Sequence, residues 1–321
     1  MSCIAGRRIV LTGGGGFLGQ AVCRELANHQ PAEVHAPRRA EFDLRDRQAI
    51  QALLHQSKPD VIIHLAAVVG GIGANRQNPG HFFYENAIMG IELIEQARLA
   101  GVEKNTVAGT ICAYPNHTPV PFREADLWAG YPEETNAPYG LAKKMLIVQS
   151  LAYRHQLGLN AINVLPVNIY GPGDNFDPQS SHVIPALIRK VHQAKQAQQS
   201  FIEVWGTGTA SREFLFVRDA ARGIVMATDQ YDSPEPVNLG SGDEITIRDL
   251  VSLICELSDW NGEIRWDKTQ PDGQPRRCLD TNRARQEFGF ESQIGLRQGL
   301  QETIDWFRSH SGGYRADVYN V

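Results

Sequence analysis

A run of glycines near the N-terminus constrains the fold of this chain more than any other feature. Four glycines follow Thr12, and the apolar segment 8–11 comes directly before them. A strand, a glycine-rich turn and a helix in this order bind a dinucleotide, because glycines let the backbone approach a pyrophosphate and the first helical N–H groups bind its oxygens. We therefore expect an enzyme that uses a nicotinamide dinucleotide. The expected contacts are Gly13, Gly14, Gly15, Gly16, Phe17, Leu18 and Gly19, in a register that begins at Gly13 or at Gly14.

Short apolar segments alternate with amphipathic segments along the first half of the chain. The expected strands cover 8–12, 33–36, 61–65, 106–109 and 161–165, and the expected helices cover 17–28, 46–56, 81–100 and 136–155. This alternation predicts an α/β fold of Rossmann type, with a doubly wound parallel sheet. We expect a dinucleotide-binding domain over 1–170, joined by about 213–238. A smaller, discontinuous α/β lobe over 171–212 and 239–321 is expected to bind the substrate.

Composition and charge narrow the range of partners. The chain carries a net charge of −5 without a block of like charge, which disfavours a nucleic-acid or anionic-membrane surface. No apolar run approaches the ~20 residues of a membrane-spanning helix, and the N-terminus lacks a signal-peptide pattern, so we expect a cytoplasmic protein. The five cysteines are scattered without CxxC spacing, which disfavours both a disulfide framework and a metal site.

The end of the second expected strand indicates which dinucleotide is bound. NAD-binding sites usually have an acidic residue there for the ribose hydroxyls, whereas this chain has Arg38 and Arg39. Two guanidinium groups suit the 2′-phosphate of NADP(H), because arginine makes forked, charge-assisted contacts with phosphate. The alternative is a solvated basic turn. We expect NADP(H), with Asp43 and Leu44 lining its adenine.

A tyrosine and a lysine stand four residues apart in the expected helix 136–155. Tyr139 and Lys143 therefore share one face of the helix, where an ammonium group would stabilise a tyrosinate and lower the pKa of the phenol. Such a tyrosine can act as an acid or a base at neutral pH. Thr110 follows the fourth expected strand and could offer its hydroxyl to a substrate carbonyl.

Several motifs together resemble the extended short-chain dehydrogenase/reductases. They are the glycine turn, residues 60–67 (DVIIHLAA), the Tyr139–Lys143 pair and residues 168–172 (NIYGP). The likeness runs from about Arg8 to Phe307 and implies a Rossmann-fold enzyme that modifies a nucleotide sugar with NADP(H). It further implies cofactor contacts from Ala66, Ala67, Ala108, Gly109, Thr110, Lys143, Pro166, Val167, Asn168, Ile169 and His182.

A narrower set of motifs is similar to the GDP-L-fucose synthase family. These motifs are residues 69–72 (VGGI), 109–115 (GTICAYP), 174–176 (DNF), 181–187 (SHVIPAL), 205–208 (WGTG), 212–215 (REFL), 271–273 (PDG) and 279–280 (LD). The likeness implies GDP-4-keto-6-deoxy-D-mannose as substrate, which is epimerised at C3 and C5 and then reduced at C4 by NADPH. It implies a homodimer built from the helices around 81–100 and 136–155.

The same likeness implies a role for each residue of the chemical centre. Cys112 and His182 would act as base and acid at C3 and C5, because the 4-keto group acidifies those protons, and His182 would titrate near neutrality. Tyr139 would protonate the C4 oxygen, assisted by Lys143 and Thr110. Contacts to the GDP-sugar are implied for Lys190, Trp205, Arg212 and Asp280.

One position departs from the family pattern. The family usually has two serines where this chain has Thr110 and Ile111, so only the first hydroxyl is kept. The departure leaves open a second enzyme function, a reductase or epimerase for another GDP-sugar. A dinucleotide-binding protein without activity is a further alternative, which the Tyr139–Lys143 pair disfavours.

Overall fold

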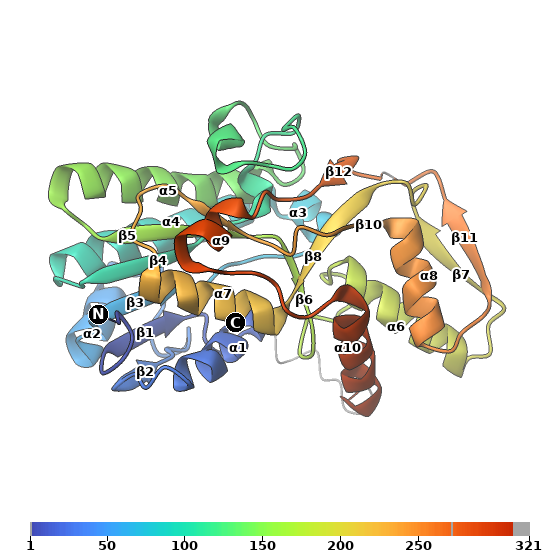
Figure 1. The fold of residues 1–321 in the computed structure, drawn as a ribbon, viewed down its shortest axis with the longest axis horizontal. Helices are drawn as coiled ribbons and strands as arrows, with labels where there is room; N and C mark the ends of the chain where they lie inside the picture. The colour runs from blue at the N-terminus through green and yellow to red at the C-terminus, as the bar shows by residue number, and fades with distance from the viewer. Residues whose placement is uncertain (1, 271, 311–321) are drawn as a thin grey trace.

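A six-stranded parallel sheet forms the centre of the N-terminal part of the molecule (Figure 1). The computed structural model describes residues 2–270 and 272–310. The strands lie in the order β2 (Glu33–His35), β1 (Arg8–Thr12), β3 (Val61–His64), β4 (Lys104–Ala108), β5 (Ala161–Pro166) and β9 (Val237–Leu239). The chain winds outward from β1 in both directions, which confirms the doubly wound fold. The switch point between β1 and β3 is where such sheets bind ligands.

Helices cover both faces of this sheet because the strands alternate their side chains between two cores. Ile9 and Leu11 of β1 belong to one hydrophobic cluster, whereas Val10 between them belongs to another. The first face is covered by α1 (Phe17–Ala27) and α7 (Val217–Gln230); the second is covered by α2 (Arg47–Ser57), α4 (Pro79–Leu99) and α5 (Ala137–Leu157). Apolar residues on both sides of each strand explain why the strands read as nearly continuous hydrophobic runs.

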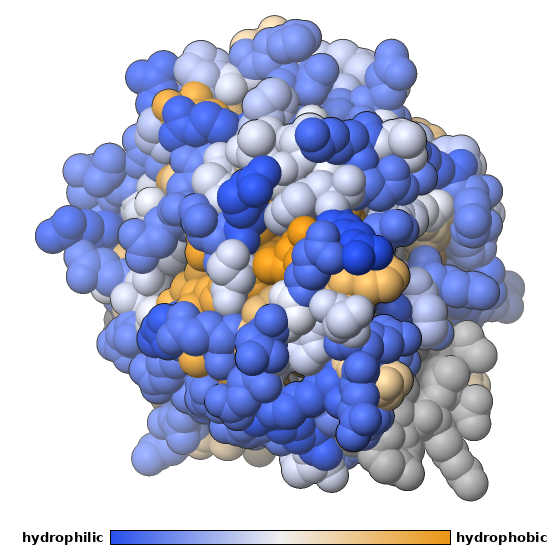
Figure 2. All heavy atoms as spheres, turned by 90° about the vertical axis from the view of Figure 1, so that its right-hand side faces the viewer, coloured by the Kyte–Doolittle hydropathy of each residue, from blue (hydrophilic) through white to orange (hydrophobic). Residues whose placement is uncertain are grey.

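The C-terminal part of the chain builds a second region with its own core (Figure 1). β8 (Ser211–Phe216) pairs with β6 (Asn168–Tyr170), β10 (Glu244–Thr246) and β12 (Arg276–Arg277), while β7 (Phe201–Trp205) pairs with β11 (Glu263–Asp267). The helices α6 (Val183–Gln196), α8 (Ile247–Leu257) and α10 (Leu296–His310) supply most of the apolar side chains. Its outer face is mainly hydrophilic, with a hydrophobic area near the middle (Figure 2).

The chain crosses back from the second region to the first at α7. Because β8 lies in the smaller sheet, the crossing falls at Val217, where α7 begins. After α7, β9 completes the large sheet, and α9 (Asn282–Phe288) later packs beside both. Three short helices complete the structure: α3 (Ile72–Gln77), η1 (Ile111–Ala113) and η2 (Glu124–Trp128). Within the described ranges, no helix has the length and apolar character needed to cross a membrane.

Candidate active site

A large cavity lies at the carboxyl ends of β1, β3, β4 and β5 and extends into the second region. Its volume is about 1770 Å³. It brings together most of the residues that the sequence predicted: Gly13, Gly15, Gly16, Phe17, Leu18, Gly19, Arg38, Arg39, Asp43, Leu44, Ala66, Ala67, Ala108, Gly109, Thr110, Cys112, Tyr139, Lys143, Pro166, Val167, Asn168, Ile169, His182, Lys190, Trp205 and Arg212. Two predicted residues, Gly14 and Asp280, are not part of its described lining.

The glycine turn joins β1 to α1 at one end of the cavity. Gly13 adopts a φ of 75°, and a Cβ there would lie 2.7 Å from the backbone nitrogen of Ala66, so only glycine fits. A Cβ on Gly14 would instead meet the Cβ of Ala36 at 2.6 Å, just beyond β2. Gly14 therefore packs against the sheet and does not face the cavity. The register that begins at Gly13 is the one the geometry supports.

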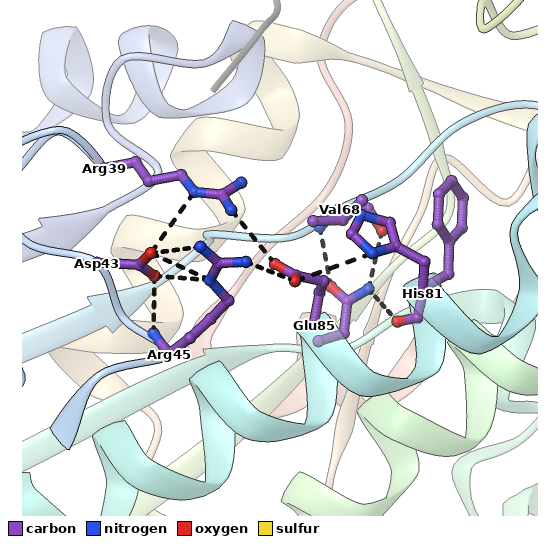
Figure 3. A network of polar contacts seen from close by, with 8 residues as sticks. Arg39, Asp43, Arg45, Val68, His81 and Glu85 are labelled. Carbon is purple, nitrogen blue, oxygen red and sulfur yellow. Dashed lines mark hydrogen bonds and ion pairs between the residues drawn. The ribbon is translucent and has the colours of Figure 1, made fainter.

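Basic residues line the cavity beyond this turn. The Arg39 guanidinium lies 4.0 Å from Asp43 Oδ2 and 3.7 Å from Glu85 Oε2 (Figure 3). Hydrogen bonds from Arg45 lower the pKa of Asp43 to about 2, so this carboxylate stays ionised. The glycine turn leaves no room for a side chain at Gly13, and arginines line the cavity wall beyond the turn. Both features fit a dinucleotide that carries a 2′-phosphate.

Four residues of the chemical centre meet at the carboxyl end of β4. Thr110 Oγ1 accepts a hydrogen bond from Cys112 N at 3.2 Å and so caps η1. Tyr139 and Lys143 lie one turn apart on α5. That helix approaches Cys112 closely because residue 140 is a glycine, where a Cβ would lie 2.2 Å from Cys112 O. Local packing therefore places the thiol beside the phenol.

Burial changes the acid–base properties of the tyrosine and lysine from those predicted. Burial raises the pKa of Tyr139, and negative charge on Cys112 raises it further, while a hydrogen bond with Thr110 opposes the rise. Burial also lowers the pKa of Lys143 to about 8. The expected fall in the phenol pKa is wrong for this structure, because the low dielectric disfavours both charges. Tyr139 is therefore protonated at neutral pH and can donate a proton.

His182 directly precedes α6 and faces the cavity. It keeps exposed surface there, yet desolvation by the surrounding walls lowers its pKa. The shift is away from the neutral range that the sequence predicted, because an imidazolium loses hydration in this position. The imidazole is neutral at neutral pH in this structure.

The second region contributes polar and aromatic groups to the far end of the cavity. Trp205, at the end of β7, leaves 60% of its surface exposed. Lys190 on α6 donates to the carbonyl of Glu203, and Arg212 on β8 donates to the carbonyls of Ser211 and Asp272. Burial lowers the pKa of Arg212 to about 10, so the guanidinium keeps its charge at neutral pH.

Arg277, Gln274 and Asp272 are among the lining residues that the sequence did not predict individually. Arg277 on β12 places its Nη1 atom 3.8 Å from Cys112 Sγ. Gln274 accepts from Arg277 Nε at 2.7 Å, and Asp272 accepts from Thr207 N at 2.7 Å. The motif 271–273 and the Arg276–Arg277 pair were the available sequence signals, although Pro271 itself lies outside the described residues.

Asp280 has a structural position, in contrast to the predicted substrate contact. Its carboxylate accepts from Asn282 N at 2.9 Å at the start of α9. Its backbone carbonyl accepts from Asn238 Nδ2 at 3.0 Å, and its N–H donates to Phe122 O at 2.9 Å. These bonds join three segments outside the described cavity lining, so the geometry does not support the substrate contact that the family likeness implied.

Ile111 shows why the second serine of the family pattern can be replaced here. Its side chain is 3% exposed and belongs to the main hydrophobic cluster. Thr110, whose Oγ1 bonds with Cys112 N, keeps the hydroxyl next to Tyr139. The departure therefore adds apolar packing and retains the first hydroxyl.

Three features define the class of protein. The glycine turn fits a dinucleotide, Tyr139 and Lys143 form a buried pair, and the cavity extends from the large sheet into the second region. Together they define a dinucleotide-dependent enzyme. Comparison with known families agrees: residues 9–240 match the NAD dependent epimerase/dehydratase family. The chain is 39% identical over 310 residues to the GDP-L-fucose synthase of Sinorhizobium fredii, covering 97% of this chain and 98% of the relative. It is 35% identical to the GDP-L-fucose synthase of Escherichia coli K12, covering 96% of this chain and 99% of that one.

Solved structures give the same result. A GDP-L-fucose synthetase from Naegleria fowleri, bound to NADP, superposes with a TM-score of 0.86 at 28% identity, covering 96% of this chain and 95% of that chain. The chain therefore belongs to the NAD dependent epimerase/dehydratase family and, within it, to the GDP-L-fucose synthases.

Proposed function

We propose that the protein converts GDP-4-keto-6-deoxy-D-mannose to GDP-L-fucose, by epimerisation at C3 and C5 followed by NADPH-dependent reduction at C4. The observation that carries this proposal is the meeting of Cys112 and Tyr139 at one end of α5, in a cavity that also includes His182. Proton exchange on carbon and proton delivery to oxygen can then occur at one sugar ring. The names of the most similar relatives support the same reaction.

Epimerisation needs a base and an acid beside the ring. The C4 carbonyl acidifies the protons on C3 and C5, and the Cys112 thiolate removes them one at a time. The Arg277 guanidinium lies 3.8 Å from the sulfur and places a positive charge beside it. His182 donates a proton at the other face of the ring, the removed proton stays on Cys112, and exchange with solvent restores both groups before the second inversion. The negative diphosphate of the substrate would raise the pKa of His182, which burial lowers.

Reduction needs a proton at the C4 oxygen. NADPH supplies the hydride when it is bound on the glycine turn, with its 2′-phosphate near Arg38 and Arg39. Tyr139, which burial keeps protonated, donates the proton, and Thr110 holds the carbonyl oxygen through its hydroxyl. Lys143 lies one helical turn from Tyr139 and supplies positive charge as the phenolate forms.

The GDP end of the substrate would lie in the second region. Lys190 and Arg212 supply the cations that a diphosphate requires, and both line the cavity. Trp205 presents an exposed indole on which a guanine base can stack. Arg277 connects this end to the chemical centre, because β12 and β8 place it beside Arg212.

A homodimer through α4 and α5 is part of the same proposal. These two helices pack side by side and leave large apolar side chains exposed: Phe83, Tyr84 and Leu99 on α4, and Met145, Val148 and Leu157 on α5. Val148 is 52% exposed. A second copy related by twofold symmetry would cover the same helices on both chains.

A second candidate function is the conversion of another GDP-sugar. Thr110 and Ile111 stand where the family has two serines, and one relative, at 33% identity over 303 residues, is named GDP-L-colitose synthase. Rates measured with a panel of GDP-4-keto sugars separate the two functions. The first proposal requires GDP-4-keto-6-deoxy-D-mannose to have the highest kcat/KM of the panel.

A further inference from the structure

Two carboxylates hold two arginines together beside the dinucleotide end of the cavity (Figure 3). Arg45 donates to both oxygens of Asp43, from Nε to Oδ1 at 2.9 Å and from Nη2 to Oδ2 at 2.5 Å. Its remaining terminal nitrogen, Nη1, donates to Glu85 Oε1 at 2.8 Å. Arg39 lies on the other side of the same two acids. One network therefore connects the loop after β2 to helix α4.

Within this network, Asp43 and Arg39 line the cavity. Arg38, the residue before Arg39, lines it as well. An uncompensated carboxylate this close to Arg39 would repel a 2′-phosphate bound there. Asp43 stays ionised, since its hydrogen bonds with Arg45 lower its pKa to about 2. The Arg45 guanidinium neutralises that charge locally and engages both oxygens.

Glu85 is the buried residue to which both arginines of the network are paired. It is only 3% exposed and comes from α4, about forty positions beyond Arg45 in the sequence. A buried carboxylate is stable only when it is paired, and this one has Arg45 at 2.8 Å, Arg39 at 3.7 Å and His81 at 3.9 Å. The two guanidinium groups of Arg39 and Arg45 balance the two carboxylates, so Arg38, which also lines the cavity, adds uncompensated positive charge to this network.

We propose that Glu85 and Arg45 set the preference for NADPH over NADH, although neither belongs to the described cavity lining. Arg45 masks the charge of Asp43, and Glu85 holds Arg45 and Arg39 in the arrangement that accepts a 2′-phosphate. Both are positioning residues, since they act through Asp43 and Arg39. The inference rests on NADP(H) binding and is independent of which sugar is the substrate.

The test compares the Kd values of NADPH and NADH, measured by nucleotide fluorescence on the full chain without any sugar. In Arg45→Met and in Glu85→Gln we expect NADPH binding to weaken about tenfold and NADH binding to stay within about twofold, because one nearby charge interaction is lost. The matched controls are Arg47→Met and Glu92→Gln. That pair joins α2 to α4, at 2.9 Å, and both control variants should keep the wild-type ratio.

A rescue variant distinguishes charge masking from loss of structure. The double variant Arg45→Met/Asp43→Asn should recover most of the NADPH preference, because the carboxylate that Arg45 masks is gone. Equal weakening of both nucleotides, an unchanged ratio, or failure of the rescue in folded protein would each overturn the proposal. Thermal melting reports folding, and Glu85→Gln decides the result if Arg45→Met does not fold.

Discussion

Arg277 Nη1 lies 3.8 Å from Cys112 Sγ, so a cation from the second region contacts the thiol of the first. Gln274 holds this arginine by accepting from its Nε at 2.7 Å, and Gln274 itself donates to Asn116 O at 2.7 Å. The guanidinium is therefore tied to the same loop that carries the cysteine. This contact joins the GDP end of the cavity to the carbon chemistry.

Replacing Arg277 should make Cys112 less nucleophilic. A unit positive charge about 4 Å from a thiolate contributes about 1 kcal/mol even in a water-like dielectric, or roughly sixfold. We expect Arg277→Gln to slow alkylation of Cys112 by iodoacetamide about that much at neutral pH, read by mass spectrometry of the peptide. Arg276→Gln is the control, because Arg276 is the neighbouring arginine and pairs with Glu244 at 2.6 Å. Equal alkylation in both variants would refute the role of Arg277.

Cys112→Ser should block proton exchange on the sugar while the fold persists. Serine is a much weaker base than a thiolate at neutral pH, so deuterium from solvent should no longer enter C3 or C5. Tyr139→Phe provides the complementary variant, with slow reduction and retained exchange, because only the proton donor to oxygen is removed. NMR of the recovered sugar measures both. Full exchange in Cys112→Ser would exclude Cys112 as the base.

Lys143→Met should stabilise the protein at neutral pH while impairing reduction. The folded-state pKa of Lys143 is about 8, against 10.5 for the free side chain. The unfolded chain binds the proton more tightly, so the penalty is fully present below pH 8 and disappears as the pH rises to 10.5. Removing it should add at most about 3 kcal/mol to the free energy of unfolding at pH 7.

Denaturant titrations of the two proteins at several pH values check this expectation. The gain in Lys143→Met over wild type should shrink steadily above pH 8, because the wild-type lysine then loses its charge. A variant that is less stable than wild type at pH 7 would contradict the account of a buried, destabilised ammonium group.

The fold was largely predictable because its strands are apolar on both faces. The expected strands and helices of the first half lie within two residues of the observed bounds. The second region was harder to predict, because β6, β10 and β12 are only two or three residues long and take their partners from distant segments. Periodicity cannot reveal strands that complete less than two alternations.

Site residues could be predicted where a motif determines the backbone conformation. They were harder to predict where the position or the pKa of a side chain depends on tertiary packing. The positions of Gly13, Thr110 and Tyr139 followed from strand ends and helix spacing. The family likeness did not place Asp280 correctly, because its carboxylate accepts from Asn282 N at the start of α9, outside the described cavity lining. The rise in the pKa of Tyr139 and the fall in the pKa of His182 were not predicted, because burial depends on the packed walls of the cavity, which the sequence does not display.

Val148→Asp should dissociate the proposed homodimer. The side chain is 52% exposed on α5, where a second copy would bury it, and an unpaired carboxylate in an apolar interface is costly. Light scattering after size-exclusion chromatography should show a dimer for wild type and a monomer for the variant. Tyr131→Asp is the control, since Tyr131 is 62% exposed outside α4 and α5 and should leave a dimer. A monomeric wild type, or a dimeric Val148→Asp, would refute this interface.

Identification of the product by NMR tests the central claim most directly. The protein is incubated with GDP-4-keto-6-deoxy-D-mannose and NADPH in deuterated water. The account predicts loss of nicotinamide absorbance and formation of GDP-L-fucose with deuterium at C3 and C5. Absence of NADPH oxidation, or a reduced sugar that keeps the configuration of the substrate at C3 and C5, would contradict it.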